Sequence, residues 1–178
     1  TTIPAKATKE MSLMMNLDSR VNKMEFDIEK PEKTSNFSNS MTINDNIGTA
    51  RTVTVYYNKT DNNQWEYHVA ADGKDVEGGK PDTMYEMANG KLKFNDKGQL
   101  EERVENKNSF NFNKGAAKDQ KINISWGQSL KDGGTGLDAT TQYGSDSAIS
   151  RGTQDGSTAA TLTSLSFNDK GILTAVYN

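Results

Sequence analysis

The 178-residue sequence contains no cysteine, a single histidine and no long hydrophobic run. The absence of cysteine excludes disulfides, thiolate nucleophiles and cysteine-ligated metals. A single histidine removes most transition-metal sites as well. The longest apolar stretches, such as residues 171–176, are far shorter than the ~20 residues that span a bilayer. The sequence therefore predicts no membrane span and no metal site.

An excess of charge of one sign is also missing, because 21 Lys and Arg residues face 24 Asp and Glu residues. Without a basic block, neither a nucleic acid nor an anionic membrane surface is favoured as a partner. Leu, Ile, Val and Phe together make up about 17% of the chain, which is low for a globular protein. We therefore expect a folded chain with a thin core and long polar loops.

Alternating apolar and polar residues predict strands along most of the chain. In residues 51–57, Thr52 and Thr54 alternate with Val53 and Val55. The same pattern predicts further strands at residues 41–44, 64–69, 109–113, 120–126 and 161–167. Residues 81–88 are a weaker candidate for a helical or irregular piece. This spacing of strands is typical of an all-β protein.

Residues 6–18 allow two interpretations. Their Ala, Lys, Glu and Met content favours a helix. However, Met11, Leu13, Met15 and Leu17 recur at every second position, which is the period of a strand. We expect a strand here.

One short motif occurs twice. Residues 92–100 and residues 165–173 share the pattern Phe-Asn-Asp-Lys-Gly-x-Leu. A strand that ends in an aromatic residue, followed by a turn with glycine at a position that needs positive φ, predicts a β-hairpin. We therefore expect a hairpin at each copy.

Composition divides the chain at two crossings, one charged and punctuated by proline at residues 24–36, and one rich in glycine at residues 131–136. These crossings predict two β-rich domains of barrel or sandwich type. The inner domain is discontinuous and consists of residues 1–30 plus 138–178. The outer domain, residues 31–137, is inserted into it. The chain opens without Met and stops within an alternating run, so we expect it to be a fragment.

Three stretches follow one another in a specific order. The first is Pro-Ala-Lys-Ala-Thr at 4–8 with Leu13 and Asn-Leu-Asp-Ser at 16–19. The second comprises residues 35–45, 53–57, 63–67 and 91–98, and the third is Thr-Gln-Asp-Gly at 153–156 with Leu162, Ser164 and residues 167–171 and 177–178. In this order they resemble the bacterial flagellar hook protein family. Two sites depart from the family pattern: Ser-Thr-Ala-Ala at residues 157–160 replaces an aromatic or Lys followed by Gly, and residues 70–87 have no clear match.

The resemblance implies an extracellular structural subunit that is exported through the flagellar type III apparatus without a cleaved signal. Such subunits self-associate with identical copies in a helical tube, the hook, which acts as a universal joint between motor and filament. Hook-cap and hook–filament junction proteins are the other implied partners, with no nucleic acid and no membrane. The terminal helices of the family are missing here, and the chain corresponds to two outer domains. Because the remaining contacts are polar, we expect it to be monomeric at micromolar concentration.

Two alternatives stay open. One is another axial flagellar protein, such as a distal-rod or hook-capping relative. The other is a carbohydrate-binding or adhesin-like β module that would use Trp65, Tyr67, Tyr56 and Tyr57 as a stacking platform. Because no basic residues surround these aromatic side chains, an aromatic core face is the favoured interpretation.

No residue is predicted to be catalytic, to bind a cofactor or to ligate a metal. His68, the only imidazole, alternates with Trp65 and is expected on a solvated strand face. Glu101, Glu102 and Glu105 are acidic residues of the kind that a glycosidase pairs, but a chain with 24 acids always contains some pair. The Asn-Asp-Lys-Gly turns lack the ligand spacing of a Ca²⁺ loop. Residues 133–136 lack the Lys of a phosphate-binding loop and are interpreted as a hinge.

Overall fold

The computed structural model describes residues 1–178, apart from the side chain of Thr163, and it confirms the all-β class. Short 3-10 helices lie in the loops at Glu32–Thr34, Gly73–Asp75 and Leu130–Asp132. The strands are β1 (Thr2–Ile3), β2 (Glu10–Asn16), β3 (Phe37–Asn44), β4 (Ala50–Asp61), β5 (Gln64–Asp72), β6 (Met84–Phe94), β7 (Leu100–Asn108), β8 (Asn123–Ser125), β9 (Ala148–Gln154), β10 (Ala160–Phe167) and β11 (Leu173–Tyr177).

Strands β3 to β7 form an antiparallel sheet in chain order, so each strand pairs with the next one along the sequence. The predicted alternation in β4 is confirmed: Val53 and Val55 are fully buried, whereas Thr52 is exposed. In β5, Trp65, Tyr67 and Val69 point to the same buried side. Period-two patterning thus turns one face of this sheet towards the core.

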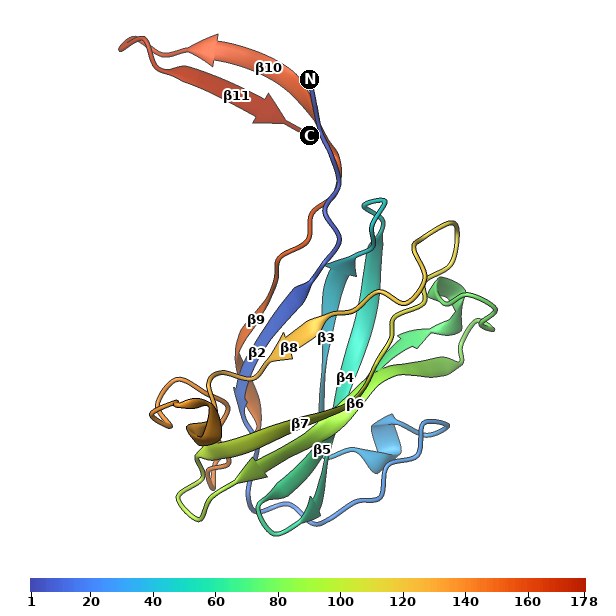
Figure 1. Cartoon of the computed structure of the whole chain (residues 1–178), viewed down its shortest axis with the longest axis vertical. Helices are drawn as coiled ribbons and strands as arrows, with labels where there is room; N and C mark the ends of the chain where they lie inside the picture. Colours follow the sequence, from blue (N-terminus) through green and yellow to red (C-terminus); the bar gives the residue numbers. More distant parts are fainter.

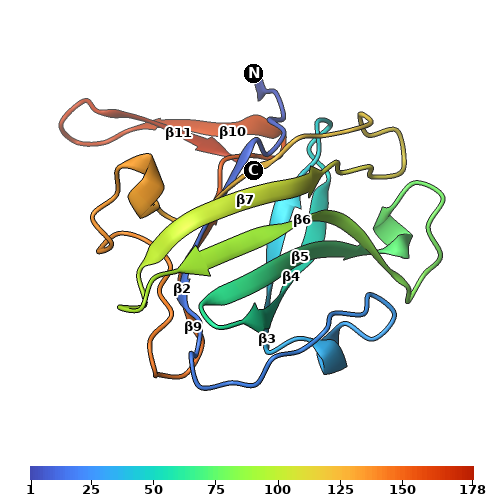
Figure 2. The same ribbon diagram turned by 60° about the horizontal axis from the view of Figure 1, so that its bottom comes forward.

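A second, smaller sheet has β2 at its centre, paired in parallel with β8 and antiparallel with β9. The strand interpretation of residues 6–18 is confirmed over β2, because Met11, Leu13 and Met15 are buried at every second position. Figure 2 shows β2 and β9 behind the curved five-stranded sheet. Packing against this sheet overrides the helix propensity of Ala, Glu and Met in the segment.

The two sheets surround one cluster of buried hydrophobic residues. Met11 and Leu13 of β2 belong to this cluster together with Val53 of β4 and Trp65 of β5. The cluster thus draws on residues from both of the domains predicted from the sequence. The boundaries 1–30 plus 138–178 and 31–137 stay a prediction.

The sheets meet at two seams where neighbouring strands are not paired. At the seam between β7 and β8, Arg103 Nη1 donates to the carbonyl oxygen of Ile124 at 2.6 Å. At the seam between β3 and β9, a groove of about 700 Å³ runs between residues 39–42 and residues 149–154. Incomplete closure leaves strand edges and the spaces beside them accessible to other molecules.

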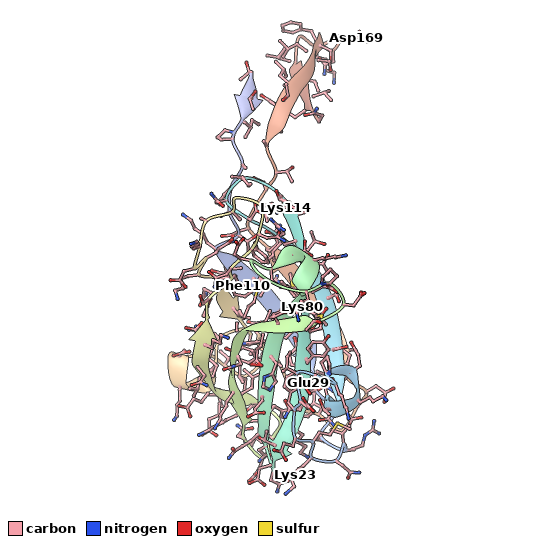
Figure 3. All side chains as sticks on the ribbon, turned by 90° about the vertical axis from the view of Figure 1, so that its right-hand side faces the viewer. Lys23, Glu29, Lys80, Phe110, Lys114 and Asp169 are labelled. Carbon is pink, nitrogen blue, oxygen red and sulfur yellow. The ribbon has the colours of Figure 1, made fainter. Side chains whose placement is uncertain are left out.

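Strands β10 and β11 form a hairpin that, with β1, projects from one end of the molecule (Figure 1). The first and last residues of the chain lie near each other at the base of this hairpin. Figure 3 places Asp169 at the tip of the hairpin and Lys23 at the opposite end of the elongated molecule.

Two predicted elements are wrong. Residues 81–88 are not helical, because β6 begins at Met84 and pairs with both β5 and β7. Residues 109–113 do not form a strand, although Phe110 and Phe112 are buried as the alternation indicated. Their backbone pairs with other segments through the isolated bridges Val76–Phe112 and Phe110–Gln120 and not through a continuous ladder, yet both phenylalanine side chains enter the core. Of the strand predicted at residues 120–126, only residues 123–125, which are β8, form a strand.

Candidate interaction surfaces

The two Phe-Asn-Asp-Lys-Gly motifs form turns of the same geometry, which confirms both predicted hairpins. Asn95 Oδ1 accepts the backbone N–H groups of the second and fourth residues after it, at 3.0 Å each. Asn168 Oδ1 does the same at 2.9 Å. The turn glycines have nearly equal positive φ values, 77° at Gly98 and 76° at Gly171. Equal local sequence therefore gives equal local structure.

The surroundings of the two turns differ. In the first copy, Phe94 and Leu100 are buried, and Gly98 is in contact with Gln142. In the second copy, Phe167 is 72% exposed and Leu173 is 54% exposed. The exposed apolar residues here are Ile3, Leu165, Phe167, Ile172, Leu173, Val176 and Tyr177, which we call the hairpin surface. Leu165, Phe167 and Leu173 lie on one face of the hairpin, because Phe167 pairs with Leu173 and Leu165 is two positions from Phe167. Exposed apolar side chains gathered in this way mark a site of contact with another part of an assembly.

The charged crossing at residues 24–36 covers the outer face of the five-stranded sheet. Phe26 stacks on His68 with ring centroids 3.8 Å apart, and Glu66 and Glu86 lie 3.3 Å and 3.0 Å from the two ring nitrogens of His68. His68 lies on the strand face opposite the core, but it is buried, so the prediction that it is solvated is wrong. Burial favours a higher pKa for Glu86, but hydrogen bonds from His68 and Asn89 outweigh it and hold this pKa below its usual range.

An ion pair holds the start of this crossing. Arg20 Nε and Nη2 each donate to a different oxygen of Asp18 at 2.9 Å. This hydrogen bonding from Arg20 lowers the pKa of Asp18 to about 2. Lys59 Nζ donates to the carbonyl oxygen of Ser19 at 2.8 Å, and Asn58 Nδ2 donates to that of Met24 at 3.0 Å. The crossing is thereby attached to β4.

A buried polar centre was not predicted from the sequence. Arg51 in β4 is 2% exposed, and its Nε donates to Asp45 Oδ2 at 3.0 Å. Its Nη1 and Nη2 donate to the side chain and the carbonyl oxygen of Asn113 at 2.7 Å, and Asp75 lies 3.3 Å from Nη1. The sequence contained one indication of this centre. Arg51 is two positions from the buried Val53 in the same strand, so its side chain points to the same face of the sheet. This centre joins the β3–β4 turn to the loop that follows β7.

The acidic residues considered for catalysis, Glu101, Glu102 and Glu105, lie along β7; Glu101 is exposed, and the other two make contacts within the fold. Glu102 Oε2 lies 3.0 Å from Lys131 Nζ and 3.8 Å from Lys93 Nζ. Glu105 Oε1 accepts a hydrogen bond from Asn108 at 2.7 Å. Among the described residues, no three His, Asp or Glu side chains are grouped so that they could hold a metal ion.

The aromatic residues and the glycine-rich segment that were considered as binding sites also contribute to the fold itself. Trp65, Tyr57, Tyr56 and Tyr67 are each 3% exposed or less, so they form no open stacking platform. In the glycine-rich segment, Gly133 ends the 3-10 helix Leu130–Asp132 with a φ of 90°. No helix among the described residues is long and apolar enough to cross a membrane.

Comparison with known proteins gives one family match, to the model described as flagellar basal body protein FlaE D2 domain, over residues 16–157. No curated protein matches the sequence. A solved 32 kDa fragment of the flagellar hook protein FlgE from Caulobacter crescentus is 16% identical with a TM-score of 0.51, over 68% of this chain and 46% of that chain. The Helicobacter pylori flagellar hook protein FlgE2 is 14% identical with a TM-score of 0.48, over 79% of this chain and 29% of that chain.

The chain spans less than half the length of these two solved proteins. At 16% identity, the likeness to the Caulobacter crescentus fragment concerns the fold. The family match carries more weight, because it covers well over half of the chain and confirms the resemblance found in the sequence. The chain therefore belongs to the flagellar basal body protein FlaE D2 domain family.

Proposed function

We propose that this chain is part of a structural subunit of the bacterial flagellar hook, located outside the cell, and that it has no enzymatic role. The observation that carries the proposal is the family match over residues 16–157. In the proposed role, identical subunits assemble into the tube that passes motor torque to the filament. Hook-cap and junction proteins would contact the ends of this tube.

The exposed apolar side chains of the hairpin surface support an assembly role. Phe167, Ile172 and Leu173 are each more than half exposed on a two-stranded hairpin whose only strand neighbour in the described part of the chain is β1. Because a hairpin with so few neighbours is marginal in water by itself, contact with another part of the assembly would stabilise it. The rest of the molecule extends away from it, towards Lys23 at the far end (Figure 3).

Immunogold labelling of intact flagella from the source bacterium tests the proposal. Antibodies raised against the 178-residue chain should label the curved hook between the cell surface and the filament. Labelling of the rod alone would support the alternative of a distal-rod relative. Antibodies that label no part of the flagellum would refute the flagellar role.

Gene deletion separates the remaining axial candidates. Loss of the hook is expected if the chain belongs to the hook subunit. A hook of normal length in the deletion strain would exclude this role. The adhesin-like alternative loses support because the aromatic residues that it requires are buried.

Sedimentation velocity tests the expected monomeric state. The sequence-based reason for a monomer was the polarity of the contacts, and the hairpin surface departs from it. We still expect a monomer at micromolar concentration, because a surface confined to one narrow hairpin is smaller than stable protein interfaces. A sedimentation coefficient that rises with concentration, and that Phe167→Ser abolishes, would contradict this expectation and identify the hairpin surface as the contact.

A further inference from the structure

The seam between β7 and β8 contains a cavity of about 280 Å³, which we call the seam pocket. One side of it is formed by Tyr67, Arg103 and Glu105 from the five-stranded sheet. The other side is formed by Asn123, Ile124, Trp126 and Asp132. The cavity thus lies between the two sheets, at a point where no ladder joins them. Its volume is just below the range of ordinary small-molecule sites.

Two buried aromatic side chains at this pocket have polar groups without a partner. Tyr67 is 3% exposed and Trp126 is 1% exposed, and their rings lie 4.7 Å apart. Within the described part of the chain, neither the Tyr67 hydroxyl nor the Trp126 indole N–H makes a hydrogen bond. The other tryptophan differs, because Trp65 Nε1 donates to Gln142 Oε1 at 2.7 Å. Among the described residues, Asn58 Oδ1 is the only enclosed side-chain polar atom without a partner. The Tyr67 hydroxyl and the Trp126 N–H are therefore not sealed in the core, and as groups without a protein partner on side chains that line the pocket they are available to a ligand.

The Tyr67 hydroxyl keeps its proton at neutral pH. Burial, followed by the nearby charge of Glu105, raises its pKa to about 12, although Arg103 acts in the opposite direction. The hydroxyl group can therefore both donate and accept a hydrogen bond inside the pocket.

Further hydrogen-bonding capacity comes from the pocket rim. Arg103 uses Nη1 for the carbonyl oxygen of Ile124, and its Nε lies 4.0 Å from Asp132 Oδ2. Asn108 occupies one carboxylate oxygen of Glu105, which leaves the other oxygen available. The backbone N–H of Asn123 donates to the carbonyl oxygen of Lys9 at 2.8 Å, whereas its side-chain amide makes no hydrogen bond to any described residue. The cavity wall therefore presents both hydrogen-bond donors and acceptors.

The charges at the pocket restrict the ligand. A cation would be opposed by Arg103, and an anion would be opposed by Glu105 and Asp132. An uncharged molecule with several hydroxyl groups meets neither repulsion and can use both the donors and the acceptors. We propose that the seam pocket binds a small uncharged polyhydroxyl ligand, a monosaccharide in size and chemistry, with the Tyr67 hydroxyl and the Trp126 indole N–H as its hydrogen-bond partners. This proposal does not depend on the assembly role.

Nuclear magnetic resonance on the ¹⁵N-labelled 178-residue chain tests the proposal. The probes are D-glucose, D-galactose and N-acetyl-D-glucosamine, with D-glucuronate and D-glucosamine as charged comparisons. At least one neutral sugar should shift the indole signal of Trp126 in a saturable way, with a dissociation constant in the millimolar range. The indole signal of Trp65, which is bonded inside the core, should not move. The charged sugars should bind more weakly.

Tyr67→Phe is the decisive variant, because it removes the hydroxyl group and keeps the ring. It should weaken binding of the sugar about 3- to 10-fold, as expected for one hydrogen bond. Tyr85→Phe, which removes a hydroxyl group outside the pocket, should leave the affinity unchanged. If Tyr67→Phe does not fold, Asn123→Ala at the exposed rim replaces it, with the same expected direction.

Three results would overturn the proposal. The first is that no neutral sugar shifts the Trp126 signal. The second is that Trp65 and Trp126 shift equally, which would indicate a general solvent effect. The third is an unchanged affinity in the variants of Tyr67 and Asn123. Equal or tighter binding of a charged sugar would refute the proposed ligand class.

Discussion

Replacing Arg51 by methionine should cost more stability than most single substitutions in this chain. The guanidinium group is 2% exposed and its partner Asp45 is fully buried. Methionine fills a similar volume but leaves the Asp45 carboxylate in the core without its counter-charge. It also removes the hydrogen bonds that Arg51 donates to the Asn113 side chain and carbonyl oxygen.

The expected loss is about 3 to 5 kcal/mol in the free energy of unfolding, which is the cost of breaking a buried ion pair by removing one partner. This is a large part of the about 5 to 15 kcal/mol that stabilises a typical domain. Asp45→Asn combined with Arg51→Met should recover part of the loss, because the uncompensated charge is then absent. An asparagine oxygen can still accept the backbone N–H groups of Ile47 and Thr49, as Asp45 Oδ1 does.

Urea unfolding followed by tryptophan fluorescence measures these differences, because both tryptophans are buried. Arg151→Met on β9 is the matched control, since Arg151 is exposed and should change stability by no more than about 0.5 kcal/mol. A loss below about 1 kcal/mol for Arg51→Met, with an unchanged dependence on urea, would refute the reasoning. So would a double variant that is as unstable as Arg51→Met alone.

Three other predictions concern the turns, the pH dependence and the domains. Gly171→Val should destabilise the terminal hairpin by roughly 1 to 3 kcal/mol, because Gly171 has a positive φ. Gly98→Val should lower the stability measured by thermal unfolding further, because the new Cβ would also lie 2.6 Å from the backbone oxygen of Gln142. Because the pKa of Asp18 is lowered, its ion pair with Arg20 is fully stabilising above the ordinary pKa of 3.8, and this contribution is lost as the pH falls towards 2. The free energy of unfolding should therefore differ less between pH 6 and pH 2 in Asp18→Asn than in the unchanged chain. Residues 31–137 expressed alone should unfold cooperatively if the predicted domain division holds, and calorimetry showing no transition would place β2 and β9 in the same domain as this segment.

Much of the fold was predictable because strand patterning is local. The positions of Met11, Leu13 and Met15 fixed the phase of β2 against a helix-favouring composition. The repeated Phe-Asn-Asp-Lys-Gly motif was enough to predict both turns, since the asparagine side chain and the positive-φ glycine are parts of the turn itself. The family resemblance also required only the order of short motifs along the chain.

The seam pocket and the buried polar centre were beyond such patterns. Tyr67 was predicted as a core residue, but nothing in its strand indicates that its hydroxyl group lacks a partner. That property depends on residues 123–132, which are more than fifty positions away in the sequence. Arg51 had the phase of a buried residue, yet its partner Asn113 lies 62 residues further along the chain.

The sequence by itself determined the strands, their alternating faces and the two turns, because these depend on neighbouring residues and on backbone sterics. Only the tertiary structure decided which faces are covered. Alternation placed His68 on the face opposite Trp65, but the packing of Phe26 over that face is what buries it. Likewise, two turns of equal sequence differ in exposure, since residues 142–143 cover Gly98 and no described residue lies within contact distance of a side chain added at Gly171. Local sequence sets conformation, whereas burial depends on which distant segments pack against it.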